Sequence, residues 1–305
     1  MIFRTALLAL LVATPAAAET LRVGPGERFA VPSAAAREAR AGDRILIAPG
    51  VYRDCTTFRT PDLTVEAAPG GAVEITGPVC GDKALFVTAA PRITIIGVTF
   101  RGATASPGNG AGIRMEGADL TVRNTRFIDN QNGILTNANM PGARLVIENS
   151  AFIGNGFLLA ECAHGLYAGR LALVSIRASR FEATRRCHHV KSRAQRTEIS
   201  DTLIADGDNH QASYLVDIPN GGDLVLRNSE LRKGPRAENT EAAVVIGAEG
   251  VVHPTTTLQV FGNRFTNLMP RGTVFVRNRS QTPVDLQANS FSGQVTPLEG
   301  PGTVR

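Results

Sequence analysis

A short apolar strand recurs along the chain, and this repeat constrains the fold more than any other feature. Its last residue falls at the following positions: Phe100, Phe127, Phe152, Phe181, Ile204, Leu231, Phe265 and Phe291. Successive ends are 23 to 34 residues apart, which is too short for two packed helices. Apolar and polar residues alternate in each unit, with Gly, Asn or Asp between the strands. The repeat therefore predicts an all-β solenoid of stacked coils, each with two or three strands in parallel sheets.

Asparagines recur at the same interval as the coils. Asn124 and Asn149 are 25 residues apart, and so are Asn130 and Asn155. In stacked coils, equivalent Asn side chains can hydrogen-bond along a turn and satisfy backbone groups that stacking would bury. We therefore expect both pairs to form structural ladders.

An alanine-rich segment ahead of the coils predicts a short helix. Residues 32–41 read PSAAAREARA, with Ser33 as a suitable N-cap and Gly42 and Asp43 following. A solenoid needs a cap because a bare terminal coil exposes apolar interior and unpaired strand edges. We expect this helix to close the N-terminal end of the stack.

Four cysteines provide an independent test of the repeat. Cys55 and Cys80 are 25 residues apart, as are Cys162 and Cys187, so one coil separates the members of each pair. Neighbouring strands lie about 4.8 Å apart, within the Cα separation that a disulfide spans. An even number of cysteines in an exported chain favours these two disulfides over the other pairings.

The first residues have the pattern of a secretory signal peptide. Arg4 precedes an apolar run at residues 6–13, and residues 14–18 read TPAAA, which suits signal peptidase. The run is much shorter than the roughly 20 residues that span a bilayer, which disfavours a membrane anchor. We expect a signal peptide at residues 1–18, a mature chain from Glu19 without a membrane span, and a periplasmic or secreted protein.

No linker divides the rest of the chain. We expect one elongated domain at residues 19–295 and a flexible C-terminal tail at residues 296–305. The tail shows no heptads, so we expect a monomer rather than a trimeric spike. The chain has 13 Phe, 3 Tyr and no Trp, so its core must use many small aliphatic side chains, as thin stacked sheets do.

The formal net charge of the chain is +5 at pH 7. A positive charge favours anionic partners, and outside the cytoplasm an acidic polysaccharide is the natural candidate. Nucleic acid is disfavoured because the sequence has no Lys/Arg block interleaved with aromatics and no zinc-finger or helix-turn-helix pattern.

Two sequence stretches and the coil pattern carry a resemblance to a known superfamily. Residues 23–29 read VGPGERF, residues 34–55 read AAAREARAGDRILIAPGVYRDC, and strands of the NxxF type follow. From about residue 20 to 295, the chain resembles the right-handed parallel β-helix superfamily with the pectate-lyase-like fold. Its members include polysaccharide lyases, glycoside hydrolases, uronan epimerases, esterases and phage or adhesin spikes, so the resemblance implies a carbohydrate-facing protein.

Unusual polar residues concentrate in three consecutive coils, at residues 161–169, 187–193 and 213–222. In the middle coil, strand alternation places Val190 and Ser192 on the inner face. His189, Lys191 and Arg193 are then expected to project outward together.

The same parity aligns residues of the neighbouring coils. Tyr167, Lys191 and Asp217 are expected to form a column with about 5 Å between neighbours. Gly165 and Gly169 leave open space beside it. We therefore expect a basic, outward-facing groove that can hold a sugar chain.

Lysis of a uronan needs a base for the proton α to the carboxylate, a cation for the resulting enolate and a proton donor for the leaving oxygen. His189 or Lys191 is the expected base. Arg193 suits the cationic role because its guanidinium pairs with a carboxylate through two hydrogen bonds. Tyr167 is the expected proton donor.

Further polar residues complete the predicted site. His164 and His188 are expected to orient their neighbours, and Asp217, Asn220 and Glu249 to contact the substrate. The Lys191-Ser192 pair is similar to the Lys-Ser motif of calcium-assisted alginate and chondroitin lyases of this fold. The arginine that those lyases carry one coil later is missing here.

Each predicted site residue also has a structural interpretation. Lys191 and Asp217 can form an ion pair, which would keep the lysine charged and unsuited to act as a base. His164 and His188 can cap turns. Arg193 can solvate the face, and Tyr167 can pack against a neighbouring coil.

No cofactor is expected, although two metals are alternatives. Zinc has potential ligands in Cys162, His164, Cys187 and either His188 or His189, but oxidation outside the cytoplasm argues against free thiolates. Calcium would need several carboxylates at one point. The acidic residues closest to this description are expected to form a solvated turn: Asp201, Asp206 and Asp208.

The sequence thus predicts an exported carbohydrate-active protein. A polysaccharide lyase or epimerase acting on a uronic-acid glycan is favoured over a glycoside hydrolase, because the segment around Lys191 lacks paired aspartates. The alternative is a non-catalytic glycan-binding or envelope scaffold protein that uses the same side chains for stacking and charge.

Overall fold

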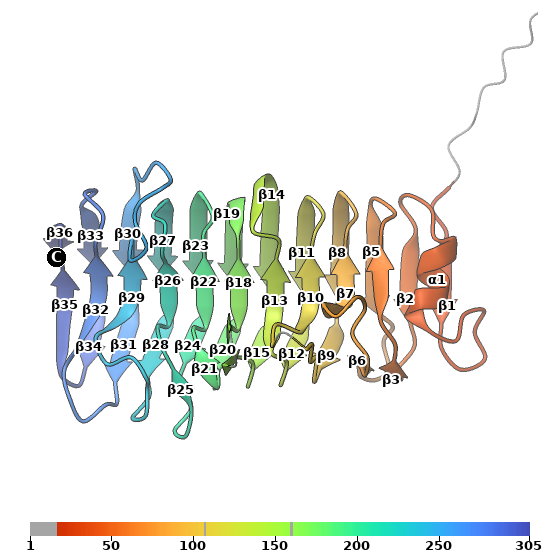
Figure 1. The fold of residues 1–305 in the computed structure, drawn as a ribbon, viewed down its shortest axis with the longest axis horizontal. Coiled ribbons are helices and arrows are strands. Elements are labelled where there is room, and N and C mark those ends of the chain that lie inside the picture. The colour runs from red at the N-terminus through yellow and green to blue at the C-terminus, as the bar shows by residue number, and fades with distance from the viewer. Residues whose placement is uncertain (1–16, 107, 159–160) are drawn as a thin grey trace, which may run out of the picture.

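The computed structural model describes residues 17–106, 108–158 and 161–305. They form an elongated stack of coils in which strands lie side by side along the long axis (Figure 1). Residues 1–16 of the expected signal peptide lie outside the described residues. No helix in the described part of the chain is long and apolar enough to cross a bilayer.

Three parallel sheets, here called A, B and C, run along the stack. Apolar and polar residues alternate along each strand, so one face of each sheet is apolar and faces the interior. Sheet A has 12 strands within the described residues. In stacking order they are β1 (Thr20–Val23), β2 (Arg44–Ile47), β5 (Leu63–Ala67), β8 (Arg92–Ile96), β11 (Asp119–Arg123), β14 (Asn139–Glu148), β19 (Arg170–Arg177), β23 (Arg196–Ser200), β27 (Asp223–Arg227), β30 (Leu258–Phe261), β33 (Val284–Gln287) and β36 (Gly302–Val304).

Sheets B and C have 10 strands each within the same residues. Sheet B consists of β3 (Gly50–Arg53), β6 (Val73–Thr76), β9 (Val98–Arg101), β12 (Arg126–Ile128), β15 (Ala151–Ile153), β20 (Arg180–Glu182), β24 (Leu203–Ala205), β28 (Glu230–Lys233), β31 (Arg264–Asn267) and β34 (Ser290–Ser292). Sheet C consists of β4 (Thr56–Phe58), β7 (Ala84–Thr88), β10 (Ala111–Met115), β13 (Asn132–Thr136), β18 (Leu166–Ala168), β22 (Val190–Ser192), β26 (Val216–Ile218), β29 (Ala242–Ile246), β32 (Thr273–Asn278) and β35 (Val295–Glu299). Two short pairs lie beside the sheets: β16 (Phe157–Leu158) with β17 (Cys162–Ala163), and β21 (Arg186–Cys187) with β25 (Gln211–Ala212).

The predicted coil register is confirmed in sheet B. Phe100, Phe127, Phe152 and Phe181 are consecutive partners in one row. The row continues through the remaining predicted strand ends: Ile204, Leu231, Phe265 and Phe291. The first four rings stack with centroids 4.3 to 5.3 Å apart. This row of buried aromatic rings fills the interior of the solenoid.

The expected ladder of Asn130 and Asn155 is confirmed. The Asn130 Nδ2 donates to Asn155 Oδ1 at 3.0 Å, and the Asn130 backbone N–H reaches the same oxygen at 3.1 Å. Asn155 Nδ2 in turn donates to the carbonyl of Phe127 at 2.8 Å. Both side chains are buried, so each bond satisfies groups that water does not reach.

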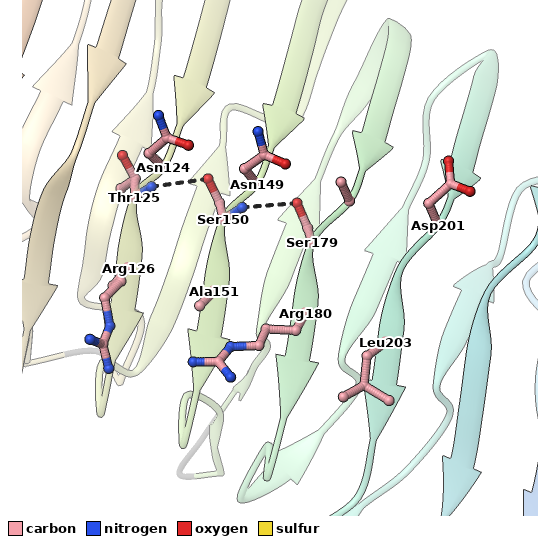
Figure 2. Close-up of a pocket in the computed structure, with 11 residues that line it drawn as sticks. Asn124, Thr125, Arg126, Asn149, Ser150, Ala151, Ser179, Arg180, Asp201 and Leu203 are labelled. Atoms are coloured by element: carbon pink, nitrogen blue, oxygen red, sulfur yellow. Dashed lines mark hydrogen bonds between the residues drawn. The ribbon is translucent and has the colours of Figure 1, made fainter.

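The same expectation is wrong for Asn124 and Asn149. Their φ angles are 52° and 48°, the left-handed conformation that Asn tolerates better than most residues. At this turn, serine hydroxyls connect successive coils instead. Ser150 Oγ accepts the N–H of Thr125, and Ser179 Oγ accepts the N–H of Ser150 (Figure 2). The two asparagines therefore shape the turn through their backbone.

Helix α1 (Pro32–Glu38) covers the N-terminal end of the stack, as expected (Figure 1). Ala35 is fully buried against the core. The N-cap is Val31 rather than the expected Ser33, because Pro32 already occupies the start of the helix, where its fixed φ is favourable. The N–H of Ser33 donates instead to Asp54 Oδ2 at 2.7 Å.

Residues 296–305 differ from the flexible tail expected from the sequence. Strand β35 pairs with β32 in sheet C, and β36 pairs with β33 in sheet A. Val295 and Leu298 pack against the core from this last coil. Pairing and apolar contact therefore order a segment whose Gly and Pro content favours disorder.

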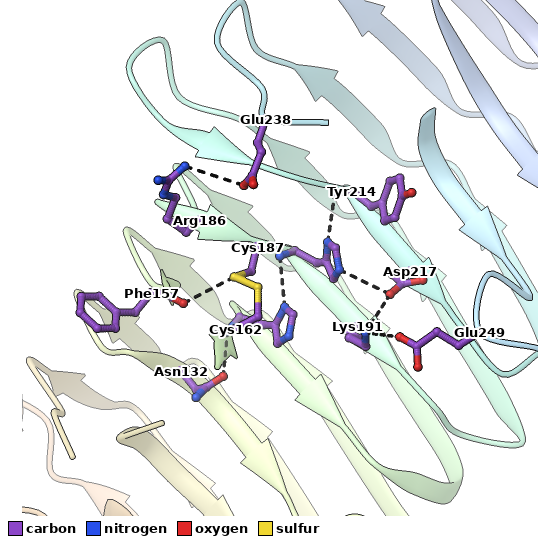
Figure 3. Close-up of a disulfide and its surroundings, with 12 residues drawn as sticks. Asn132, Phe157, Cys162, Arg186, Cys187, Lys191, Tyr214, Asp217, Glu238 and Glu249 are labelled. Carbon is purple, nitrogen blue, oxygen red and sulfur yellow. Dashed lines mark hydrogen bonds and ion pairs between the residues drawn. A yellow bond between two sulfur atoms is a disulfide. The ribbon is translucent and has the colours of Figure 1, made fainter. Parts of the chain in front are cut away.

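Both predicted disulfides are confirmed. Cys55 and Cys80 have Cα atoms 5.5 Å apart, and Cys162 and Cys187 have Cα atoms 5.9 Å apart. Each bond joins residues 25 positions apart in sequence, which is one coil. The second disulfide lies beside the polar residues described next (Figure 3).

Candidate functional site

Sheet C carries the predicted polar column on its outer face. Tyr167 of β18 pairs with Lys191 of β22, which pairs with Asp217 of β26. The flanking residues Val190 and Val216 are fully buried. The parity predicted for the three polar side chains is therefore confirmed, because strand alternation holds through these coils.

Arg193, just beyond the end of β22, joins three neighbours through its guanidinium. Nε donates to the Tyr167 hydroxyl at 3.1 Å, and NH1 donates to Asn220 Oδ1 at 2.5 Å. NH2 lies 2.7 Å from Glu249 Oε2. Because all three nitrogens are engaged, the orientation of the guanidinium is fixed.

Lys191 is bound by two carboxylates, those of Asp217 and Glu249 (Figure 3). Its Nζ lies 3.3 Å from Asp217 Oδ2 and 2.7 Å from Glu249 Oε1. A lysine that acts as a base must present a free amine, whereas here the group serves as a paired ammonium. The geometry favours the ion-pair interpretation of Lys191 over its predicted role as a base.

The two carboxylates of this cluster have opposite pKa shifts. Burial raises the pKa of Asp217 to about 6, against the opposing effect of Lys191. Burial also raises the pKa of Glu249, but hydrogen bonds from Lys191 and Arg193 outweigh it and lower that pKa below its usual value. Glu249 is therefore a stable anion, whereas Asp217 titrates at about pH 6.

His164 and His188 belong to a ladder that crosses the coils. Asn132 Oδ1 accepts the backbone N–H of His164 at 2.8 Å, and His164 Nδ1 accepts that of His188 at 3.1 Å. His188 Nδ1 accepts the backbone N–H of Tyr214 at 3.1 Å. Each imidazole is thus neutral with its proton on Nε2.

The surroundings of the two histidines support this neutral form. Burial, followed by the charge of Lys191, lowers the pKa of His188 to about 3. Burial and the neighbouring His188 lower the pKa of His164 well below its usual value. The His164 ring packs edge-on against Tyr167, with centroids 5.0 Å apart, and His188 Nε2 lies 3.5 Å from Asp217 Oδ2. The two rings therefore contact the side chains at the two ends of the column, Tyr167 and Asp217.

His189 does not project outward as predicted. It precedes β22, where strand alternation does not apply, and its side chain is fully buried. Nδ1 lies 2.8 Å from Thr184 Oγ1, and Nε2 lies 2.7 Å from Asp206 Oδ1. The order hydroxyl, imidazole, carboxylate is that of a nucleophilic triad, but all three groups are buried. Asp206, expected in a solvated turn, is one of these interior groups.

A cavity of about 480 Å³ lies beside the column. Arg193, Tyr167 and Asn220 form one end of it. The other lining residues are Asn109, Arg114, Asn132, Leu135, Thr136, Ala138, Asn139, Glu161, Cys162, Gly169 and Arg170. Three arginines and one glutamate give the lining a net positive charge, which favours an anionic ligand.

Arg114 and Arg170 were not predicted from the sequence. Arg114 pairs with Leu135, which pairs with Tyr167, so it lies in the same outward row two coils earlier. Extending the coil register back from Tyr167 could have found it. Arg170 opens β19 of the neighbouring sheet, and the row of sheet C gives no signal for it.

A larger surface depression, of about 620 Å³, lies over the turns between sheets A and B (Figure 2). Its lining includes Thr125, Ser150 and Ser179, which the structural ladder joins through the hydroxyls of Ser150 and Ser179. It is therefore a weaker candidate than the arginine-lined cavity.

The zinc alternative loses two of its ligands in this structure. Cys162 and Cys187 form a disulfide, so neither presents a thiolate. Within the residues described, no group of three or more His, Cys, Asp or Glu side chains is arranged to hold a metal ion.

Comparisons with known proteins define the fold. No family model and no curated protein matches the sequence. Among solved structures, the pectate lyase Pel9A matches with 14% identity and a TM-score of 0.52, covering 92% of this chain and 78% of that chain. A pectin methylesterase from Aspergillus niger matches with 12% identity and a TM-score of 0.49, covering 95% and 92%. The A-module of the mannuronan C-5 epimerase AlgE4 from Azotobacter vinelandii matches with 14% identity and a TM-score of 0.47, covering 87% and 91%.

The similarity to the pectate lyase agrees with the three parallel sheets. The chain has the right-handed parallel β-helix fold, as the sequence resemblance implied. At this level of identity the similarity concerns the fold alone.

Proposed function

We propose that this protein acts on a uronic-acid polysaccharide in the cavity beside Tyr167, by removing the proton α to a sugar carboxylate. The observation that carries the proposal is the cluster of Arg114, Arg170 and Arg193 around one cavity, with the Tyr167 hydroxyl held by Arg193 at 3.1 Å. The arginines match a carboxylate in charge and hydrogen-bond geometry. Tyr167 supplies the acid–base group.

The chemistry divides between the arginines and the tyrosine. Tyr167, whose oxygen accepts a hydrogen bond from Arg193, acts as the base that takes the C5 proton of the sugar, and the arginines stabilise the enolate that forms. In β-elimination, the electron pair forms the C4–C5 double bond, the C4–O bond breaks, and Tyr167 returns its proton to the leaving oxygen. In epimerisation, a proton from water instead returns to C5 from the opposite face, and Tyr167 releases to solvent the proton that it took.

Lys191 and the histidines have supporting roles in this proposal. Lys191 anchors Asp217 and Glu249, and His164 holds the Tyr167 ring from its edge. Export to the periplasm or the medium is part of the proposal. It is supported by the two disulfides, which persist in oxidising compartments.

The test is an assay for the unsaturated product of elimination. The parent protein and a Tyr167→Phe variant are incubated with a panel of uronic-acid polysaccharides, and ultraviolet absorbance of the product is followed. The proposal expects product from the parent and a loss on the order of 10²-fold or more in the variant. Tyr214→Phe is the matched control, because that ring stacks on His188 from the far side of the cluster.

Two other outcomes would redirect the function. Inversion of C5 configuration without new absorbance would identify an epimerase. Binding to a polysaccharide with neither elimination nor epimerisation would contradict the catalytic proposal and favour the non-catalytic glycan-binding function.

A further inference from the structure

Lys191 and Arg193 together form a binding position for one carboxylate, which Glu249 fills. Glu249 Oε1 lies 2.7 Å from Lys191 Nζ, and Oε2 lies 2.7 Å from Arg193 NH2. Each oxygen of the carboxylate therefore pairs with a different cation. Such charge-assisted contacts are also how proteins hold acidic ligands.

The two carboxylates around Lys191 differ in how freely they can leave. The side chain of Asp217 is 3% exposed and projects from strand β26, whereas that of Glu249 is 44% exposed and lies between β29 and β30. Asp217 is therefore a permanent partner of Lys191. The Glu249 carboxylate can rotate into solvent because it is itself partly exposed.

The backbone that carries Glu249 is held in place independently of its side chain. The Glu249 N–H donates to the carbonyl of Pro219 at 2.9 Å, and the N–H of Val252 donates to the carbonyl of Asn220 at 2.8 Å. Release of the carboxylate therefore needs a change of side-chain rotamer rather than a movement of the segment.

The position that Glu249 fills adjoins the cavity. Arg193, Tyr167 and Asn220 line the cavity, and the bonds of Arg193 to the other two keep its NH2 group directed at the carboxylate position. We propose that Glu249 is a displaceable internal ligand, and that the carboxylate of a uronate residue takes its place on Lys191 and Arg193. The class of ligand rests on the proposed function.

This exchange selects acidic sugars over neutral ones. A uronate carboxylate replaces the charge of Glu249, so Lys191 and Arg193 remain paired. A neutral sugar in the same position leaves Arg193 without an anionic partner and Lys191 with Asp217 alone. A neutral sugar therefore leaves Glu249 in place, and Glu249 competes only with ligands that carry a carboxylate.

The test is calorimetric binding of a uronate oligosaccharide and of its carboxyl-reduced neutral counterpart. In Glu249→Gln the internal competitor loses its charge, and we expect the uronate to bind about tenfold tighter, with the neutral sugar unchanged. Glu148→Gln is the matched control, because Glu148 bridges Arg123 and Arg177 on sheet A, away from the cavity. It is expected to bind both sugars as the parent does.

The possible failures are distinguishable. Equal or weaker binding of the uronate to Glu249→Gln would overturn the inference and leave the proposed function standing. A similar gain for the neutral sugar would show that the substitution only opens space, which also overturns it. Absence of uronate binding to both parent and variant would overturn inference and function together, whereas tighter binding without turnover would overturn the catalytic proposal alone.

Discussion

The Arg193 guanidinium connects Tyr167, the proposed acid–base group, to the charged cluster, because its three nitrogens contact Tyr167, Asn220 and Glu249. A lysine ammonium cannot reproduce three fixed directions from one planar group. We expect Arg193→Lys to lower kcat/KM on the order of 10²-fold while the protein stays folded. The assay is elimination or epimerisation on the best polysaccharide of the panel.

Arg196→Lys is the control for this substitution. Arg196 is another partly exposed arginine, three residues later, in ion pairs with Glu198 and Asp223 on sheet A. It is expected to leave turnover unchanged. Parent-like turnover by Arg193→Lys would contradict the role given to the guanidinium.

A second prediction at the residue scale concerns Asp217, whose raised pKa makes the stability of the protein depend on pH. Its pKa moves from 3.8 to about 6 on folding, so between these pH values the folded state binds more protons than the unfolded state. The unfolding free energy contributed by Asp217 therefore falls as pH rises through this window, and the deficit is complete above pH 6. Asp217→Asn removes this dependence.

We expect the stability of Asp217→Asn, relative to the parent, to increase by on the order of 3 kcal/mol between pH 4 and 7. Denaturant unfolding of both proteins across this range measures the difference. His188, whose pKa falls to about 3, has the opposite dependence but is present in both proteins. Parallel stability curves would contradict the assigned shift.

The coil is the element that builds the site, and each disulfide joins two neighbouring coils. Cys162–Cys187 links the coil that carries Tyr167 to the coil that carries Lys191, whereas Cys55–Cys80 lies near the N-terminal end. Replacing either pair by serine is expected to cost about 2–4 kcal/mol of stability. The double variant Cys162→Ser/Cys187→Ser is also expected to weaken uronate binding, whereas the double variant of Cys55 and Cys80 is not.

The two double variants control for each other because both disulfides close segments of the same sequence separation, 25 residues. Thermal unfolding and calorimetric binding provide the two measurements. Equal effects of the two variants on binding would contradict a positioning role for Cys162–Cys187.

What repeats from coil to coil could be predicted from the sequence. The row from Phe100 to Phe291, both disulfides and the column of Tyr167, Lys191 and Asp217 depend only on coil length and strand parity. The Asn pairs show the limit of spacing alone. Asn130 and Asn155 form the ladder, whereas Asn124 and Asn149, at the same spacing, adopt left-handed turns.

What lies between strands could not be predicted in the same way. His189 precedes its strand, so parity assigned it the wrong face. Glu249 reaches Lys191 across 58 positions in sequence, and the contact depends on a loop conformation that no repeat specifies. Arg170 also lines the cavity, but it belongs to sheet A, so the residue parity of sheet C does not predict it.

At the scale of the whole molecule, the solenoid brings side chains from distant coils into one row. Arg114 of β10, Tyr167 of β18 and Lys191 of β22 share the outer face of sheet C, and the cavity opens beside them. The stack is closed at its N-terminal end by α1, and each sheet continues to the last coil (Figure 1). A long polymer is a suitable ligand for such an extended surface.

The fate of the substrate's C5 proton tests the central claim most directly. Proton NMR of a uronate oligosaccharide in D₂O with the parent protein is predicted to show loss of the C5 signal, either to a C4–C5 double bond or to deuterium. The Tyr167→Phe variant is predicted to leave that signal intact. Retention of the C5 proton by an oligosaccharide that binds the parent protein in the arginine-lined cavity would contradict the account.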